Sequence, residues 1–169
     1  MEDPINKEVD KLYDSVSLRM MKTAEEAFEC GVTRLQEIKN YARQAGIKRI
    51  GIANCISFSK EALAVKHYLS GEFEVFDINC KCGGITRREM LESERGGIMC
   101  NPAGQAAFLK ENETELNISM GLCVGHDMIF NQKSSVPVTV LVVKDLANRE
   151  NPMENINSLK NAAIGSDRT

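Results

Sequence analysis

Residues 48–55 read Lys-Arg-Ile-Gly-Ile-Ala-Asn-Cys, and this stretch decides the fold. A short apolar run that follows a glycine, Gly46, and stops at a cysteine is typical of a strand buried on both faces. Helical patterns flank the run, at residues 33–45 before it and 59–69 after it. A buried strand between two helices indicates a parallel sheet that is covered by helices.

The rest of the chain repeats this alternation. Further strands are expected at residues 73–78, 116–122 and 138–143, with helices expected at residues 101–111 and after Gly125. Right-handed crossovers restrict how such strands can be ordered in a sheet. We therefore expect an α/β fold, a Rossmann-like three-layer sandwich with a mostly parallel four-stranded sheet in the order 2-1-3-4.

The chain has 169 residues, which fits one domain of ordinary size. We expect a single α/β domain over residues 1–150, divided into an N-terminal helix within 1–31 and a core over 32–150. A polar C-terminal tail should follow at residues 151–169.

Two extra N-terminal helices are expected to cover one face of the sheet. Apolar residues recur at helical spacing over residues 5–29, and Gly31 is suited to end that helix. Thr33 is placed to cap the second helix. Other capping signals are Ser59, Thr86 and Asn101, the last followed by a proline that suits a first helical position.

Composition excludes several classes of function. The net charge is −3, and no basic run suggests a nucleic-acid partner. No apolar stretch approaches the roughly 20 residues that cross a bilayer. The polar first residues do not resemble a secretory signal, so we expect a cytoplasmic protein with no membrane partner. In a reducing cytosol, cysteines more often serve as metal ligands or reactive thiols than as disulfides.

Four of the six cysteines fall near the ends of the predicted strands, and a fifth lies at a predicted helix start. Cys55 ends the first strand, Cys80 and Cys82 follow the second, and Cys123 ends the third, while Cys100 directly precedes a predicted helix start. Because parallel strands end at the same edge of a sheet, these thiols are expected to converge. Thiolates suit zinc and iron–sulfur clusters. The pattern therefore predicts a metal or cluster site at this edge.

Other residues are expected to line the cofactor. Glycines allow the backbone to approach a ligand, and their free amides can donate to sulfur. The residues expected around the cofactor are Gly83, Gly84, Asn101 and Gly125. His126 could bind the metal or carry a proton, with Asp127 orienting its ring. The alternative is that His126 is a loop residue and Asp127 a helix cap.

Two other interpretations remain open. A thiol at a helix N-terminus ionises more easily, so Cys123 or Cys100 could be the nucleophile of a thiol enzyme or a redox protein. The cysteines could also be packed side chains in a module that binds a small ligand. The sequence has neither a P-loop nor a Gly-x-Gly-x-x-Gly turn after the first strand, which disfavours the usual nucleotide sites.

Six segments resemble one family whose function is unknown. They are residues 33–38, 51–55, 80–84, 99–106, 121–127 and 137–145. The family comprises small Cys-rich proteins, found largely in anaerobic bacteria and archaea, that carry a metal-binding label. The resemblance spans roughly residues 33–152. Many members open with a short Cys-rich segment, which this chain lacks.

The resemblance implies metal binding, and it carries over the ligands Cys55, Cys80, Cys82, Cys100, Cys123 and His126. Our first choice from the strand positions is Cys55, Cys80, Cys82 and Cys123, with Cys100 and His126 in reserve. The expected cofactor is an iron–sulfur cluster or zinc. The sequence does not decide whether a reaction is catalysed, and it is compatible with a redox partner protein and with a homo-oligomer.

Overall fold

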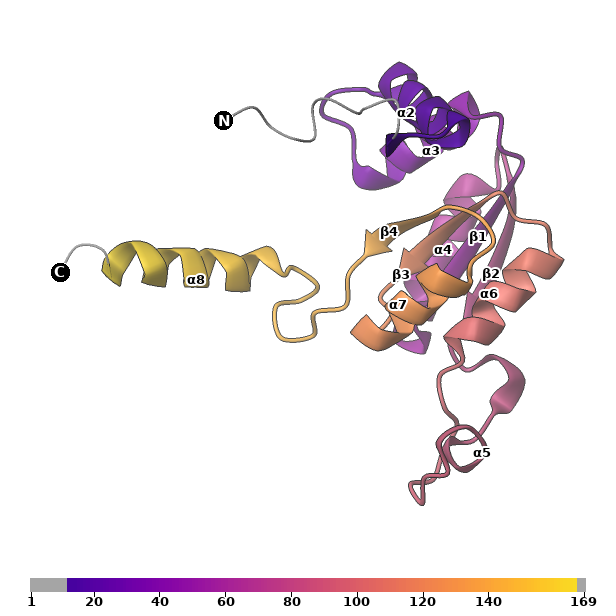
Figure 1. The fold of residues 1–169 in the computed structure, drawn as a ribbon, viewed down its shortest axis with the longest axis vertical. Coiled ribbons are helices and arrows are strands. Elements are labelled where there is room, and N and C mark those ends of the chain that lie inside the picture. The colour runs from indigo at the N-terminus through magenta and orange to yellow at the C-terminus, as the bar shows by residue number, and fades with distance from the viewer. Residues whose placement is uncertain (1–11, 167–169) are drawn as a thin grey trace. The chain divides into compact units, whose positions relative to one another are not determined.

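The structure is a computed structural model that describes residues 12–166. The chain forms two compact units, with the boundary after Ile47 (Figure 1). The N-terminal unit contains helices, and the second unit contains the sheet and the helices that cover it. The prediction that both belong to one domain over residues 1–150 stays a prediction.

The N-terminal unit is a pair of helices, α2 (Ser15–Ala27) and α3 (Arg34–Gln44). Side-chain hydrogen bonds join them, such as Gln44 Nε2 to Glu26 Oε2 at 2.9 Å. Thr33 caps α3 as predicted, because its side chain accepts from Gln36 N. The prediction that these helices cover one face of the sheet stays a prediction.

The expected continuous helix over residues 5–29 is wrong at Asp14. This residue is extended, and its carboxylate accepts from Ser17 N at 2.7 Å, so α2 begins at Ser15. An aspartate that bonds a backbone amide three residues ahead starts a helix rather than continuing one. The part of the predicted helix before residue 12 lies outside the described residues.

The sheet has four strands, and its predicted order is confirmed. The strands are β1 (Arg49–Asn54), β2 (Glu74–Asn79), β3 (Leu116–Met120) and β4 (Val138–Val142). They lie in the order β2-β1-β3-β4, and every neighbouring pair is parallel. All four strands therefore end at the same edge of the sheet.

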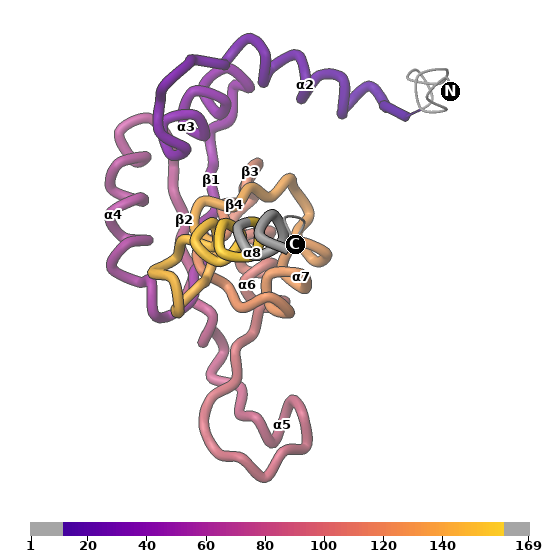
Figure 2. Tube along the Cα trace, turned by 90° about the vertical axis from the view of Figure 1, so that its left-hand side faces the viewer, coloured from indigo at the N-terminus to yellow at the C-terminus, as the bar shows by residue number. Residues whose placement is uncertain are grey.

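Helices cover both faces of the sheet, which confirms the three-layer sandwich (Figure 2). Helix α4 (Ser59–Leu69) lies on one face, and α6 (Pro102–Glu111) and α7 (Val124–Lys133) lie on the other. Ser59 was expected to cap α4 but is its first residue, because the 3₁₀ turn η2 (Ile56–Phe58) runs directly into this helix.

A long excursion joins β2 to α6 (Figure 1). It contains the 3₁₀ turn η3 (Cys82–Gly84) and the short helix α5 (Arg87–Leu91). Thr86 and Glu89 form the predicted capping box of α5. Beyond β4, the tail predicted only as polar contains a helix, α8 (Met153–Ser166).

Close packing of α6 on β1 depends on Gly51. A Cβ atom at this position would lie 2.2 Å from Asn117 Oδ1 and 2.8 Å from Leu109 Cδ1. Asn117 cannot easily move, since it accepts from Thr114 Oγ1 and donates to Ser134 Oγ. The glycine of the deciding strand is therefore a packing requirement.

We expect Gly51→Ala to lower the free energy of unfolding by about 1–3 kcal/mol, because an added methyl group overpacks this contact. Chemical denaturation measures the change. Gly71→Ala is the matched control, since nothing lies within 4 Å of a Cβ there. Equal stability of the two variants would contradict the packing argument.

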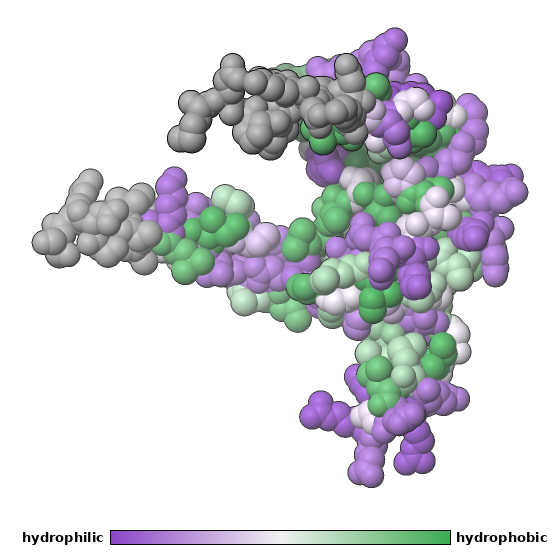
Figure 3. All heavy atoms as spheres, viewed as in Figure 1, coloured by the Kyte–Doolittle hydropathy of each residue, from purple (hydrophilic) through white to green (hydrophobic). Residues whose placement is uncertain are grey.

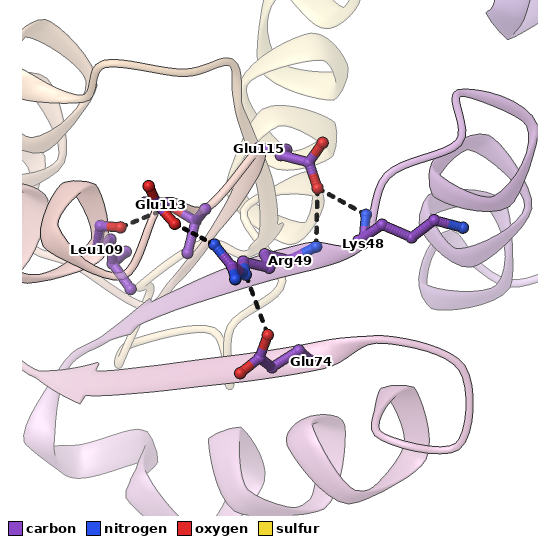
Figure 4. A network of polar contacts seen from close by, with 7 residues as sticks. Lys48, Arg49, Glu74, Leu109, Glu113 and Glu115 are labelled. Carbon is purple, nitrogen blue, oxygen red and sulfur yellow. Dashed lines mark hydrogen bonds and ion pairs between the residues drawn. The ribbon is translucent and has the colours of Figure 1, made fainter.

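Polar contacts join the strands at the opposite, N-terminal edge of the sheet (Figure 4). Glu115 accepts from Lys48 N at 2.7 Å and from Arg49 N at 2.9 Å. The Arg49 guanidinium binds Glu74 on β2 and Glu113 beside β3. The backbone hydrogen bonds from Lys48 and Arg49 lower the pKa of the Glu115 carboxyl.

We expect Glu115→Gln to cost about 1 kcal/mol of stability at neutral pH, since charged hydrogen bonds near solvent contribute modestly. A carboxyl whose pKa is lowered by folding stabilises the fold above its unfolded pKa, and that contribution is lost as the pH falls. The variant and the wild type should therefore converge in acid. Denaturation across pH tests this, with Glu111→Gln as the control, and a gap that persists in acid would contradict it.

Candidate metal centre

Four cysteines come from different elements to the carboxyl edge of the sheet. Cys55 directly follows β1 and Cys80 directly follows β2. Cys123 is the residue that precedes α7, and Cys100 comes just before Asn101, the cap of α6. The backbone joins two of these positions, because Asn101 N donates to Cys80 O at 2.7 Å.

Cys80 is the most deeply placed of these thiols. It is 1% exposed and belongs to an apolar cluster that also contains Cys55, with Cys100 packed against the cluster. Ile56 N donates to its sulfur at 3.4 Å. Burial raises the pKa of the Cys80 thiol to about 12, and the neighbouring thiols of Cys100 and Cys55 add to the shift. At neutral pH, Cys80 is therefore protonated.

The pKa of the Cys55 thiol shifts in the opposite direction, because Ser57 and Lys144 surround its sulfur. Lys144 Nζ donates to Cys55 Sγ at 3.3 Å. Burial opposes ionisation of Cys55, but hydrogen bonds from Ser57 and the Lys144 ammonium outweigh it, so the pKa of the thiol is lowered. Lys144 also interacts with Cys123, and so it links two of the edge cysteines.

Sequence reasoning missed Lys144. The next residue, Asp145, also lies just past the last strand. Asp145 instead stabilises its own loop, accepting from Asn148 N and Asn148 Nδ2. The available signal was position alone, since Lys144 also lies just past β4 at the edge where the cysteines gather.

The predicted ligands Cys82 and Cys100 differ in placement. Cys82 lies in η3, and its thiol donates to Asn101 O at 3.5 Å. Burial raises the pKa of this thiol. Cys100, which the sequence predicted only as a reserve ligand, lies beside Cys80.

The residues expected around a cofactor have local roles in the backbone. Asn101 caps α6 by accepting from Gly104 N at 2.8 Å. Gly83 and Gly84 have φ values of +78° and +64°, which favour glycine. Gly125 lies in the first turn of α7, where a Cβ would meet nothing within 4 Å. A side chain at position 125 would therefore extend into open space without a clash.

His126 is half-buried at the start of α7. Burial lowers the pKa of its ring, and the charges of Lys81 and Lys144 lower it further. Asp127, expected to orient the ring or cap the helix, accepts from Ser119 Oγ at 2.5 Å and so ties α7 to β3. The cations near His126 give this part of the edge a positive potential.

Two further findings concern the described residues only. Within residues 12–166, no three side chains of Cys, His, Asp and Glu form a ready-made group that could hold a metal ion. In the same range, no helix combines the length and apolar character needed to cross a membrane. Cys30, the sixth cysteine, is exposed in the N-terminal unit.

Residues 1–141 match a family described as protein of unknown function DUF1847. The chain belongs to the DUF1847 family. The match covers most of the sequence and includes the five cysteines near the sheet edge. The predicted membership of a family of unknown function is therefore confirmed.

A curated relative and a solved structure are similar to parts of this DUF1847 chain. An uncharacterised protein of Methanocaldococcus jannaschii is 42% identical over 118 residues, which cover 67% of this chain. The chain spans 61% of that relative's length. A crystal structure of Dph2 from Pyrococcus horikoshii with a 4Fe-4S cluster is 19% identical, with a TM-score of 0.41, over 77% of this chain and 33% of that one. That likeness is too distant to bear on function.

We expect Lys144→Met to raise the pKa of Cys55, because the ammonium that donates to its sulfur is removed. A pH titration of thiolate absorbance in the reduced, metal-free protein measures the change. Cys55→Ser should remove the same titration step. Lys133→Met, at the far end of α7, is the control and should leave the step in place. An unchanged titration in Lys144→Met would contradict the contact.

Proposed function

We propose that the protein binds a metal centre at the carboxyl edge of its sheet through the thiolates of Cys55, Cys80, Cys100 and Cys123. The observation that carries the proposal is the placement of Cys80. It is buried beside thiols that arrive from two other parts of the chain. Thiolates are the ligands that zinc and iron–sulfur clusters share.

The choice of Cys100 over Cys82 follows from their contacts. Cys100 packs against the cluster that holds Cys55 and Cys80, whereas Cys82 donates to a backbone carbonyl. Cys123 completes the set because Lys144 connects it to Cys55. The remaining predicted ligands, Cys82 and His126, then lie around the centre and do not hold it.

Electrostatics favour a negatively charged centre at this edge. Four thiolates bound to a metal centre carry net negative charge. Lys144 contacts Cys55 directly, and Lys81 lies close enough to influence His126. The amide groups at the start of α7 add positive potential, since helix N-termini attract anions. Ile56 N already donates to Cys80 sulfur, a contact of the kind that tunes clusters.

The centre would be an iron–sulfur cluster or a zinc ion. A cluster would supply electron transfer, in which case a redox partner protein would dock here, and zinc would supply structural or Lewis-acid chemistry. Either centre needs reduced thiols, which suits the cytoplasm.

The test is metal analysis with an optical spectrum, on protein purified without oxygen. Wild-type protein should contain stoichiometric metal, and single changes of Cys55, Cys80, Cys100 or Cys123 to Ser should weaken binding more than about tenfold, at least as much as loss of a supporting contact. Visible absorption with bound iron would identify a cluster, and colourless zinc-loaded protein would identify zinc.

Two control variants sharpen this test. Cys30→Ser removes an exposed cysteine in the other unit, and Cys82→Ser removes the edge thiol that the proposal leaves out. Both should keep their metal. Circular dichroism of each variant separates loss of metal from loss of fold. Metal-free wild-type protein, or metal retained after Cys80→Ser, would overturn the proposal.

A second candidate is thiol chemistry at Cys55. The specific observation is its hydrogen bond from Lys144, which favours a thiolate. The sequence had suggested Cys123 or Cys100 as the nucleophile. This function predicts one thiol that reacts first with a small alkylating reagent, identified by mass spectrometry, in protein that holds no metal.

A further inference from the structure

The excursion between β2 and α6 begins and ends at a cysteine. Cys80 directly follows β2, and Cys100 lies two residues before α6, so the pair brackets the segment that carries α5 (Figure 1). Asn101 N donates to Cys80 O at 2.7 Å, and Lys81 Nζ donates to Ile98 O at 2.8 Å. Contacts beside both cysteines therefore hold the two ends of the excursion together.

The two arms of the excursion are also joined beyond these ends. Met99 N donates to Ile85 O at 2.7 Å. Thr86 and Ile98 form an antiparallel bridge between the arms. A disulfide between distant cysteines would require the backbone to move. Here the backbone already holds the two cysteines close, so a bond between them needs little movement.

The side chains of the two cysteines are in contact. A side-chain hydrogen bond with Cys100 contributes to the raised pKa of the Cys80 thiol, and Cys100 packs against the apolar cluster that contains Cys80. Cys55 acts on Cys80 through its charge, and its sulfur accepts from Lys144 Nζ. Cys82 donates to a backbone carbonyl. Among the edge thiols, Cys100 is the partner for Cys80 that these contacts favour.

The two thiols differ in their access to solvent. Cys80 is 1% exposed, whereas Cys100 is half-buried. Figure 3 shows hydrophobic side chains on the excursion near the sheet and hydrophilic side chains at its far end. Ile98, two residues before Cys100, is apolar and partly exposed. A small uncharged oxidant therefore meets Cys100 first, and Cys80 reacts only through its partner.

We propose that Cys80 and Cys100 form a reversible disulfide when the protein meets hydrogen peroxide. The Cys100 sulfur attacks one peroxide oxygen and the O–O bond breaks, which gives a sulfenic acid and one water. The Cys80 sulfur then attacks the Cys100 sulfur, the S–O bond breaks, and the hydroxide leaves with the Cys80 proton as a second water. Two thiols are oxidised and one peroxide is reduced. A thiol reductant restores both thiols by exchange.

The disulfide also has a consequence for the metal centre, and this consequence rests on the proposed function. Cys80 and Cys100 are two of the four proposed ligands, and a metal binds the thiolate form of cysteine. Oxidation should therefore empty the centre. Bound metal should in turn protect both thiols from peroxide, so the site would bind metal only while the pair is reduced.

The test is a map of the cysteines after peroxide treatment of the full chain. Protein purified without oxygen is diluted, to make disulfides between molecules rare, and treated both as purified and after a chelator. An alkylating reagent then blocks the remaining thiols. Trypsin cuts after Lys81, which separates Cys80 from Cys82, and after Arg95, which separates both from Cys100. In the chelator-treated protein, mass spectrometry should find the peptides of Cys80 and Cys100 joined, and dithiothreitol should release them.

Two variants and one unfolded sample control this map. Cys100→Ser should lower the yield of cross-linked Cys80 to that of wild-type protein unfolded in urea, where pairing is mixed because chain length alone governs loop closure. Cys82→Ser is the matched control, since it removes another thiol of the same excursion and should leave the link intact. Circular dichroism checks the fold of each variant.

Two results would overturn the proposal. One is that Cys80 and Cys100 stay reduced in chelator-treated protein while exposed Cys30 is oxidised. The other is that Cys80 pairs mainly with a different cysteine.

Metal analysis of the same samples keeps this inference apart from the proposed function. Protein that holds no metal as purified but forms the link supports the disulfide and refutes the metal centre. Metal-loaded protein that never forms the link, even after the chelator, refutes the disulfide and supports the metal centre.

Discussion

Strand β1 pairs in parallel with β2 on one side and with β3 on the other. Every crossover must then return the chain to the N-terminal edge of the sheet. The residue that follows each strand therefore lies at the carboxyl edge. Cys55, Cys80 and Cys123 lie at one edge of the sheet for this reason, although the chain separates them by long helical segments. An antiparallel partner for β1 would send one of these cysteines to the opposite edge.

Helix α6 packs tightly against the sheet at β1. Gly51 leaves room for Asn117 and Leu109, and Asn117 holds its place through hydrogen bonds with Thr114 and Ser134. A buried amide is costly unless it is paired, so this network both fills the space and fixes the register. Close packing of α6 in turn brings its cap, Asn101, against Cys80.

The thiols at the edge have different protonation states because their surroundings differ. Cys80 lies among apolar groups and other thiols, which favours the neutral form. Cys55 receives a hydrogen bond from Lys144, which favours the thiolate. A metal centre that binds both must displace a proton from Cys80, and its binding is then stronger at high pH.

The sequence by itself determined the strands, their order, the caps at Thr33, Thr86 and Asn101, and the presence of cysteines at strand ends. These features follow from local patterns and from the crossover rule, which short segments specify. Only the tertiary structure decided that Lys144 contacts Cys55, 89 residues away, and that Cys100 rather than Cys82 lies beside Cys80. The direction of a side chain that leaves a loop depends on packing against distant residues, and no local pattern encodes it.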